Sequence, residues 1–301
     1  MDYVVPGTSH SARAMREAVL AAGAVGSPQL LQLSGISPVD ILRAANVEIV
    51  HDLSGVGENL QDHLHYRSRW EVTAPLTPFG QSAAETAAIE ARYTAERSGP
   101  LATNHFESGA FLCSSVAAGS PDIELLMIPY LINPGAPELR PPDRHGFTIS
   151  GFPTRPRSRG RVTIVSNDPL DRPAIDPCYL SDPDDLRLML EIIRRSREIA
   201  MQPAFDVVRG VEVSPGEGNA TDDELIADIR AYASTSFHPV GSCKMGTDAL
   251  AVVDPELRVH GLDGLRVADA SVMPTMITGH PNAPTIMIAE KAAELCASAH
   301  A

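Results

Sequence analysis

The last quarter of the chain, residues 237–295, constrains the fold more than any other stretch of this sequence. Its segment Leu265–Asp269 (LRVAD) is a short apolar run ending in an acid, a pattern typical of a buried parallel strand with a carboxylate at its C-terminal edge. A helix is expected to follow from about Asn282, because asparagine caps helices well and Pro284 suits a first turn. One broad apolar face is predicted for that helix, made of Ile286, Ile288, Ala289, Ala292, Ala293 and Leu295.

Two histidines, His238 and His280, lie on either side of the predicted strand in the sequence. In α/β proteins, cofactors bind in the crevice beyond strand ends, next to a helix N-terminus. Histidine is also the side chain whose pKa suits proton transfer near neutral pH. This region is therefore the candidate site for a cofactor and for catalysis.

The same region closely resembles the C-terminal signature of the glucose-methanol-choline (GMC) oxidoreductases, flavoproteins that oxidise alcohols. The matching pieces are, in order, HPVGSCKMG, VVDPELRVHGLDGLRVADASVMP and GHPNAPTIMIAEKAA. Upstream, the resemblance continues in GAVGSPQLLQLSGI (Gly23–Ile36) and GVGENLQDHL (Gly55–Leu64), so it covers essentially the whole chain.

The resemblance implies an FAD-dependent oxidation of a CH–OH group, of the alcohol or choline dehydrogenase kind. It implies that His238 is the base that removes the hydroxyl proton while a hydride passes to flavin N5, and that His280 hydrogen-bonds the substrate oxygen. It also implies cofactor contacts at Asp269, Ala270, Pro281, Asn282 and Thr285, where the positive end of the predicted helix would stabilise negative charge on reduced flavin. For Asp269 an alternative stays open, in which the acid caps the turn at Ser271.

One part of the family pattern is missing from this sequence. The usual site for the ADP half of FAD, a GxGxxG turn followed by a helix and a distal acid, occurs nowhere in it. Gly55 and Gly57 begin such a pattern, but Leu60 stands where the third glycine belongs. The chain is therefore expected to be the C-terminal portion of a GMC enzyme, either a truncated product or one half of a two-chain enzyme.

Two functions compete on this basis. The first is a flavin-dependent dehydrogenase or oxidase that acts on a small-molecule alcohol. The second is a catalytically inactive fragment or a partner subunit of a split GMC enzyme, which needs the missing N-terminal FAD-binding half. A lyase in which the flavin is structural is a third, more distant alternative. The sequence leaves the alcohol and the electron acceptor open.

Composition limits the kinds of binding partner and the cell compartment that we expect for this chain. The 301-residue chain has 44% hydrophobic and 21% charged residues, as globular proteins do, and its net charge of −14 argues against nucleic acid and anionic membranes as partners. No apolar run approaches the ~20 residues of a membrane helix, and the N-terminus lacks the features of a signal peptide. Four scattered cysteines are typical of reduced thiols, so a cytoplasmic location is expected. His63 and His65 lack a third ligand at suitable spacing, so no metal site is predicted.

The fold class indicated is α/β (α+β overall), with a substrate domain inserted into a partial FAD-binding domain. We expect residues 1–65 and 233–301 to form the partial FAD-binding α/β domain, the latter part carrying the catalytic histidines, and residues 66–232 to form the substrate-binding domain. An antiparallel sheet is predicted within the insert, from strands at Arg67–Val72, Gly109–Leu112, Ile123–Ile128, Phe147–Phe152 and Arg161–Val165.

Helices in the insert have clear start signals. Ser82–Arg97 is predicted to be helical, and Asp182 or Ser181 is expected to cap a second helix in which Pro183 opens the first turn. A capping box at Thr221–Glu224 predicts a third helix.

Several further expectations concern single segments. Ser27 is expected to cap a helix that starts at Pro28, and Val47–Val50 is expected to form a strand. The proline-rich stretch 133–144 is predicted to be an exposed loop, with a lid over a pocket as the alternative. The candidate pocket-lining aromatic residues are Trp70, Phe106 and Phe111.

Overall fold

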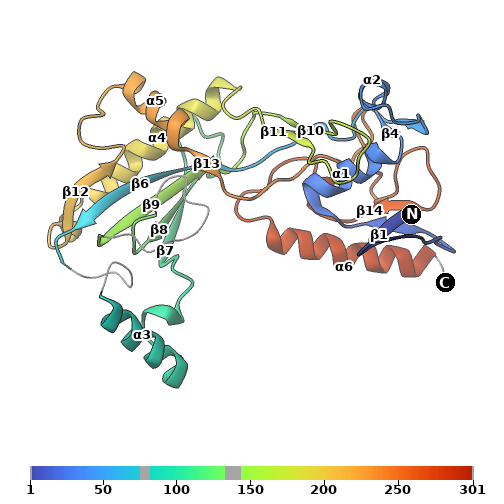
Figure 1. The fold of residues 1–301 in the computed structure, drawn as a ribbon. Coiled ribbons are helices and arrows are strands. Elements are labelled where there is room, and N and C mark those ends of the chain that lie inside the picture. Colours follow the sequence, from blue (N-terminus) through green and yellow to red (C-terminus); the bar gives the residue numbers. More distant parts are fainter. Residues whose placement is uncertain (1, 75–81, 133–143, 300–301) are drawn as a thin grey trace. The chain divides into compact units, whose positions relative to one another are not determined.

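The computed structural model describes residues 2–74, 82–132 and 144–299. The chain divides into two compact units, each built from separate stretches of sequence. The first unit comprises Met1–Asp62, Ser158–Cys178 and His238–Ala301, and the second comprises His63–Arg157 and Tyr179–Phe237 (Figure 1). Residues 158–178 thus group with the first unit, whereas the sequence analysis assigns them to the inserted domain.

The second unit is an antiparallel sheet with helices on one face. Its main sheet runs in the order β12-β6-β9-β8-β7, and β13 also pairs with β6. The strands are β6 (Leu64–Val72), β7 (Ser108–Leu112), β8 (Ile123–Ile128), β9 (Gly146–Pro153), β12 (Arg209–Ser214) and β13 (Ser234–Thr235). The helices are α3 (Ala83–Glu96), η1 (Pro100–Ala102), α4 (Pro183–Ala200), η2 (Pro203–Phe205) and α5 (Asp222–Tyr232). Four of the five predicted strands (β6, β7, β8 and β9) and the three predicted helices are therefore present in this unit.

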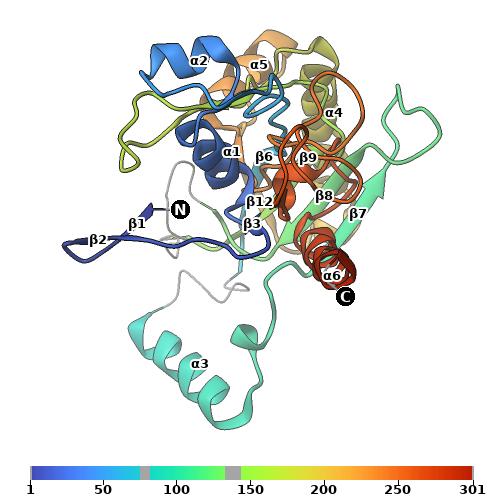
Figure 2. The same ribbon diagram turned by 90° about the vertical axis from the view of Figure 1, so that its right-hand side faces the viewer.

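Local capping explains where these helices begin. Asp182 accepts a hydrogen bond from the Asp184 N–H (2.8 Å) and Pro183 follows at the first helical position, so α4 starts as expected. The capping boxes Ser82–Glu85 and Thr221–Glu224 are both formed, at the starts of α3 and α5. None of the residues of α3 is buried, and Figures 1 and 2 show this helix standing apart from the sheet.

A hydrophobic core joins α4 and α5 to the sheet. The alternate residues Leu64, Tyr66 and Trp70 of β6 belong to it. The helices contribute Leu188, Met189, Ile192 and Ile193 from α4, and Leu225 and Ile229 from α5. One face of β6 is thus buried beneath the helices, and the residues between these positions point to the other face.

In its described residues, the first unit consists of short strands and loops around three α-helices and one 3-10 helix. Its strands are β1 (Asp2–Val5), β2 (Thr8–Ser11), β3 (Ala18–Leu20), β4 (Ile36–Ser37), β5 (His51–Asp52), β10 (Arg161–Thr163), β11 (Ala174–Asp176) and β14 (Leu265–Val267). Its helices are α1 (Gly23–Leu33), α2 (Val39–Ala44), η3 (Ala270–Val272) and α6 (Asn282–Ala299). The β1–β2 hairpin forms around Pro6 and Gly7 (Figure 2). Its described side chains are exposed.

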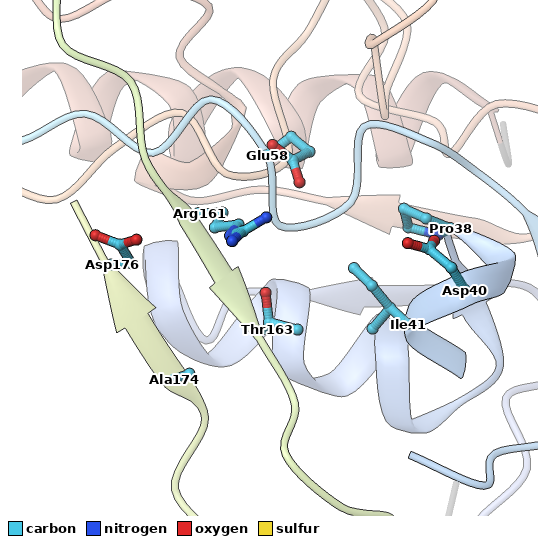
Figure 3. Close-up of a pocket in the computed structure, with 8 residues that line it drawn as sticks. All are labelled: Pro38, Asp40, Ile41, Glu58, Arg161, Thr163, Ala174 and Asp176. Carbon is cyan, nitrogen blue, oxygen red and sulfur yellow. The ribbon is translucent and has the colours of Figure 1, made fainter. Parts of the chain in front are cut away.

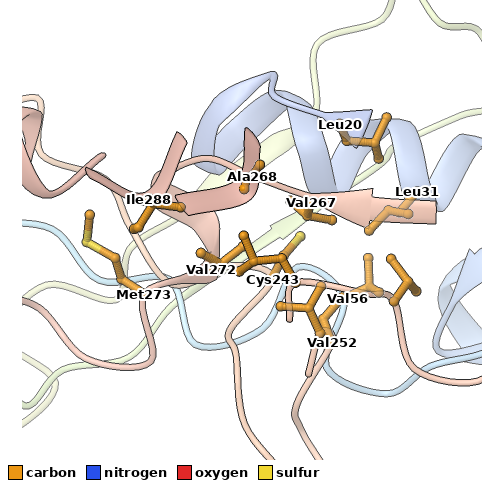
Figure 4. Packing of buried hydrophobic residues seen from close by; sticks show 14 of the residues in the cluster. Leu20, Leu31, Val56, Cys243, Val252, Val267, Ala268, Val272, Met273 and Ile288 are labelled. Carbon is orange, nitrogen blue, oxygen red and sulfur yellow. The ribbon is translucent and has the colours of Figure 1, made fainter. Parts of the chain in front are cut away.

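The core of the first unit collects residues from distant parts of the chain. Leu20, Leu31, Val56, Cys243, Val252, Val267, Val272, Met273 and Ile288 are all buried in it (Figure 4). The predicted strand in the last quarter forms β14, and it pairs in parallel with β3 in a two-stranded sheet. This pairing puts Asp269 just beyond the carboxyl end of β14, as expected.

The helix predicted to start at Pro28 begins five residues earlier, so the assignment of Ser27 as its cap is wrong. Ser27 lies fully buried inside α1, where its Oγ donates to Asp269 Oδ2 (2.5 Å) and accepts from the Ala22 N–H (3.1 Å). A partner far away in the sequence thus uses the hydroxyl group that a local pattern assigns to capping.

Two strand predictions in the first unit's stretches are also wrong. Val47–Val50 is not a strand, because its N–H groups turn back to Leu42 and Gly35, and pairing begins only at β5. Arg161–Val165 contributes β10, but this strand pairs with β11 and not with the sheet of the second unit. Gln32 holds β10 by donating to the Val162 carbonyl (2.9 Å) and accepting from the Ile164 N–H (2.7 Å).

Helix α6 differs from its prediction in two respects. Pro281 precedes it and accepts the Thr285 N–H (3.0 Å), so Asn282 is the first helical residue and not the cap. Only Ile288 and Ala292 are buried, whereas Ile286 is 56% exposed and Met287 59% exposed. Half of the predicted apolar face (Ile286, Ala289 and Ala293) is therefore exposed, while Leu295 is partly buried against the core. The stretch predicted as a proline-rich loop, apart from Arg144, lies outside the described residues.

Candidate active site

His238 sits at the start of a segment that is tied to the strand-like residues before β6. Its backbone N–H donates to Asp62 Oδ1 (2.9 Å), and Asp62 is itself buried. Gln61 and Val240 exchange two backbone hydrogen bonds, of 3.0 and 2.9 Å. Asp62 and Gln61 thus fix the position of the backbone that carries the imidazole of His238. The side chain is half-buried.

His280 lies immediately before α6. Gly279 has a φ of 102°, a backbone conformation that favours glycine, and Pro281 is buried just ahead of the first helical turn. The exposed ring of His280 meets that of His238 at a centroid distance of 4.8 Å and an interplanar angle of 81°. The structure therefore brings together the two histidines that the sequence singles out.

A network of amide side chains holds the segments that carry these histidines. Gln61 Oε1 accepts the Met276 N–H (2.9 Å), and its Nε2 donates to the carbonyl of Pro274 (3.3 Å). Asn59 Nδ2 donates to the Gly241 carbonyl (3.0 Å). These positioning roles of Asn59 and Gln61 were not predicted from the sequence, although both residues lie in the ENLQDH stretch that carries part of the family resemblance.

Asp269 is buried and fully engaged with its own chain. Its Oδ1 accepts the Ser271 N–H (2.8 Å) and so caps η3, as the alternative interpretation of this acid requires. Its Oδ2 accepts from the Gly23 N–H (2.9 Å) and from Ser27 Oγ. Ala270, next to it, accepts the Gly241 N–H at 3.3 Å. Asp269 and Ala270 thus join β14, α1 and the His238 segment.

The first turn of α6 presents backbone N–H groups beside the two histidines. Asn282 and Ala283 are exposed there, while Thr285 returns both its N–H and its Oγ1 (2.7 Å) to the Pro281 carbonyl. Unpaired N–H groups and the helix dipole make this end positive, which suits an anionic group such as the edge of a reduced flavin. Pro281, Asn282 and Thr285 are thus at this end of α6, and the cofactor contacts that the resemblance implies for them stay a prediction.

Other residues that the sequence singled out lie elsewhere. His63 is fully buried in the second unit and pairs with the carbonyl of Thr154 (2.9 Å), and His65 contacts the hydroxyls of Ser234 and Ser236. Trp70 is buried against Phe147 in the core of that unit. Phe106 and Phe111 are about half exposed. Among the described residues, no cluster of three or more histidine, cysteine or acidic side chains is arranged to hold a metal ion.

A pocket of the first unit is lined by none of the candidate site residues. It has a volume of about 450 Å³ and lies between α2 and the strands β10 and β11 (Figure 3). Its charged lining residues are Asp40, Glu58, Asp176 and Arg161. Neither of the two histidines lies in it.

Comparison with known proteins places these features in a family. Two family models described as GMC oxidoreductase match the chain, one over residues 156–289 and one over residues 3–65. The oxygen-dependent choline dehydrogenases of Serratia proteamaculans (strain 568) and Pseudomonas fluorescens (strain SBW25) are each 45% identical to it over 94% of its length. The matched regions cover 51% and 50% of those relatives, so the chain spans about half the length of the curated relatives it matches.

Solved structures agree with this assignment. Pyridoxine 4-oxidase from Mesorbium loti is 32% identical with a TM-score of 0.83, over 97% of this chain and 53% of that one. A variant of the formate oxidase of Aspergillus oryzae is 26% identical with a TM-score of 0.90, over 98% of this chain and 56% of that one. Fold and sequence agree on one family. The chain belongs to the GMC oxidoreductase family.

None of the helices that the structure describes has both the length and the apolar character needed to cross a membrane.

Proposed function

We propose that this chain carries the proton-transfer site and the substrate-binding unit of an FAD-dependent enzyme that oxidises a CH–OH group. The observation that carries the proposal is the contact between the rings of His238 and His280 beside the first turn of α6. Two imidazoles at this distance can both reach one substrate oxygen. The first unit is then part of the FAD-binding domain, and the second unit is the substrate-binding domain.

In this proposal His238 accepts the hydroxyl proton of the alcohol. Asp62 holds the backbone of His238, so the ring keeps its position during the transfer. His280 donates a hydrogen bond to the substrate oxygen and stabilises the negative charge that develops there. Deprotonation of the hydroxyl group pushes electron density toward the carbon that is oxidised.

FAD would supply the acceptor for the hydride that leaves this carbon. The residues that would hold the flavin are Pro281, Asn282 and Thr285 at the start of α6, together with Ala270 and Asp269. Asp269 would act there mainly by fixing η3 and the start of α1, since its two oxygens accept three hydrogen bonds from this chain.

The substrate is a small-molecule alcohol. The relatives' names include choline and pyridoxine, so membership of the family indicates the type of reaction and not the particular alcohol. We also propose a cytoplasmic location, because Cys113, Cys178, Cys243 and Cys296 are all free thiols.

A second function follows from the uncovered surfaces of the first unit. Helix α6 exposes Ile286 and Met287. An exposed apolar surface of this kind favours a chain that packs against a second polypeptide, as one half of a split GMC enzyme or as a partner subunit without activity of its own.

One experiment separates these functions. The chain is co-expressed with, or fused to, a GMC polypeptide that carries the Gly-rich turn, and the resulting assembled enzyme is purified. Choline, pyridoxine and simple primary alcohols are then added without oxygen, and flavin absorbance is followed. Bleaching by an alcohol supports the oxidoreductase. A yellow complex that no alcohol bleaches would support the inactive partner subunit instead.

A further inference from the structure

Two arginines of the second unit stand close together on β6. Arg67 and Arg69 are two positions apart on β6, so their side chains leave the strand on the same side. Arg69 is only 9% exposed and Arg67 is half-buried. Two like charges are thus held close together and partly withdrawn from water.

Within the described part of the chain, the guanidinium of Arg67 forms neither a hydrogen bond nor an ion pair, and the groups that affect its pKa are the charge of Arg69 and the ring of Tyr130. Burial lowers the pKa of Arg67, and the positive charge of Arg69 lowers this pKa further. Withdrawing a charge from water without a partner is unfavourable, so this arrangement costs folding free energy unless an anion binds.

The positive charge of Arg69 is better compensated by neighbouring groups than that of Arg67. One of its Nη atoms donates to the carbonyl of Ile132 (3.2 Å), and Asp228 lies close enough to raise its pKa against the lowering effect of burial. Asp228 in turn accepts the hydroxyl hydrogen of Tyr66. Asp228 therefore acts on Arg69, and no acid among the described residues has this effect on Arg67.

These groups surround a small open pocket at the edge of β6. Tyr66, Arg67, Arg69, Ile132, Ser214 and Tyr232 line it. It lies where β6 passes from its pairing with β13, at Leu64 and His65, to its pairing with β12, from Arg69 onward. The pocket has room for about one water-sized group, as a carboxylate oxygen would need.

We propose that this pocket binds the carboxylate of a small organic anion, with Arg67 as the principal contact and Arg69 beside it. A guanidinium binds a carboxylate through charge-assisted hydrogen bonds, which are about twice as strong as neutral ones. The proposal concerns binding to the second unit and goes beyond the proposed function; a cation such as choline would be disfavoured next to these arginines.

The test measures binding and does not require oxidation. Glycolate, which carries a hydroxyl and a carboxylate, is titrated into the 301-residue chain by calorimetry at constant ionic strength, with ethylene glycol and choline as comparisons. Saturable 1:1 binding of glycolate alone is expected. Arg67→Met should weaken it by about 10- to 100-fold, because one charge-assisted contact is lost. Arg230→Met, which removes an exposed charge from α5 of the same unit, should leave it unchanged.

A second measurement separates ligand binding from a structural role. Without ligand, Arg67→Met should raise the Tm, because an uncompensated charge is removed, and glycolate should no longer raise it further. Equal glycolate affinity in wild type and Arg67→Met would overturn the proposal. So would the absence of saturable binding to wild type, or a lower Tm of Arg67→Met without ligand.

The outcome is distinguishable from that of the proposed function. Glycolate binding that depends on Arg67, together with an assembled enzyme that no alcohol bleaches, would support the anion site and refute the oxidation. Bleaching by neutral alcohols without any glycolate binding would support the oxidation and refute the anion site.

Discussion

The imidazole rings of His238 and His280 lie 4.8 Å apart, centroid to centroid, and are inclined to each other by 81°. They meet because the segment after His238 pairs with the segment after β14: Gly241 donates to the Ala270 carbonyl and Cys243 to the Ser271 carbonyl. Gln61 then links the same region to Met276, shortly before His280. The pair is thus a product of chain packing and does not depend on any single element.

His238→Ala is expected to lower kcat of the assembled enzyme by roughly 10²–10⁴-fold, because the base for the hydroxyl proton is removed. The measurement is steady-state turnover with an alcohol that bleaches the wild-type flavin. His10→Ala, which removes an exposed histidine from the β1–β2 hairpin, serves as the matched control. A His238→Ala variant that retains most of the wild-type turnover would rule out this role.

His280→Asn should retain more activity than His280→Ala, because the amide still donates a hydrogen bond to the substrate oxygen. We expect about a tenfold difference in kcat/KM between the two variants, equivalent to one hydrogen bond of about 1.4 kcal/mol. Equal losses in both variants would show that hydrogen-bond donation is not the role of His280.

Asp269→Ala should destabilise the first unit by about 3 kcal/mol, whether or not FAD is bound, because three hydrogen bonds to the carboxylate are lost. Asp269→Asn keeps one oxygen acceptor and should cost less. Denaturant unfolding with and without FAD provides the measurement. A loss that appears only in the presence of FAD would mean that Asp269 contacts the cofactor and is not mainly a cap.

Acid should weaken the start of α5. Hydrogen bonds from the backbone and the side chain of Thr221 lower the pKa of Glu224. A carboxyl group whose pKa is lowered by folding contributes stability above its unfolded pKa, and this contribution is lost as the pH falls through the folded pKa. Between about pH 5 and pH 3, Glu224→Gln should therefore lose less Tm than wild type does. An identical loss in both proteins would contradict the role of this capping box.

A polypeptide of these 301 residues, expressed alone, is expected to bind FAD weakly, to self-associate and to oxidise no alcohol. Its sequence lacks the Gly-rich turn that places the pyrophosphate on a helix N-terminus, and α6 exposes Ile286 and Met287. The measurement is flavin absorbance after incubation with FAD and desalting. Retained stoichiometric flavin would show that this polypeptide suffices for binding, and the assembled enzyme serves as the positive control.

Features that depend on neighbours in sequence could be predicted. The starts of α3, α4 and α5 follow from caps within three residues of the first turn, and the strands β6 to β9 follow from their apolar and β-branched runs. The motif histidines were found in the same way, since His238 and His280 each stand in a long recognisable pattern.

Features that depend on distant partners could not be predicted. Ser27 looks like a cap, but Asp269 draws its hydroxyl group into the core. Arg161–Val165 looks like a strand of the larger sheet, but Gln32 and β11 hold it in the first unit. In the sequence, Arg67 and Arg69 are two charged positions of a predicted strand. Only the pairing of β6 with β12 and β13 makes both of them line one pocket.

By itself, then, the sequence determined the family, the helix starts and the two histidines, because these are written in short contiguous patterns. The tertiary structure alone decided which strands pair, what Asp269 binds and how close the two imidazoles lie. The physical reason is that hydrogen bonds and packing between residues far apart in the chain arise only when the chain folds, and they override local propensity wherever they bury a polar group with its partner.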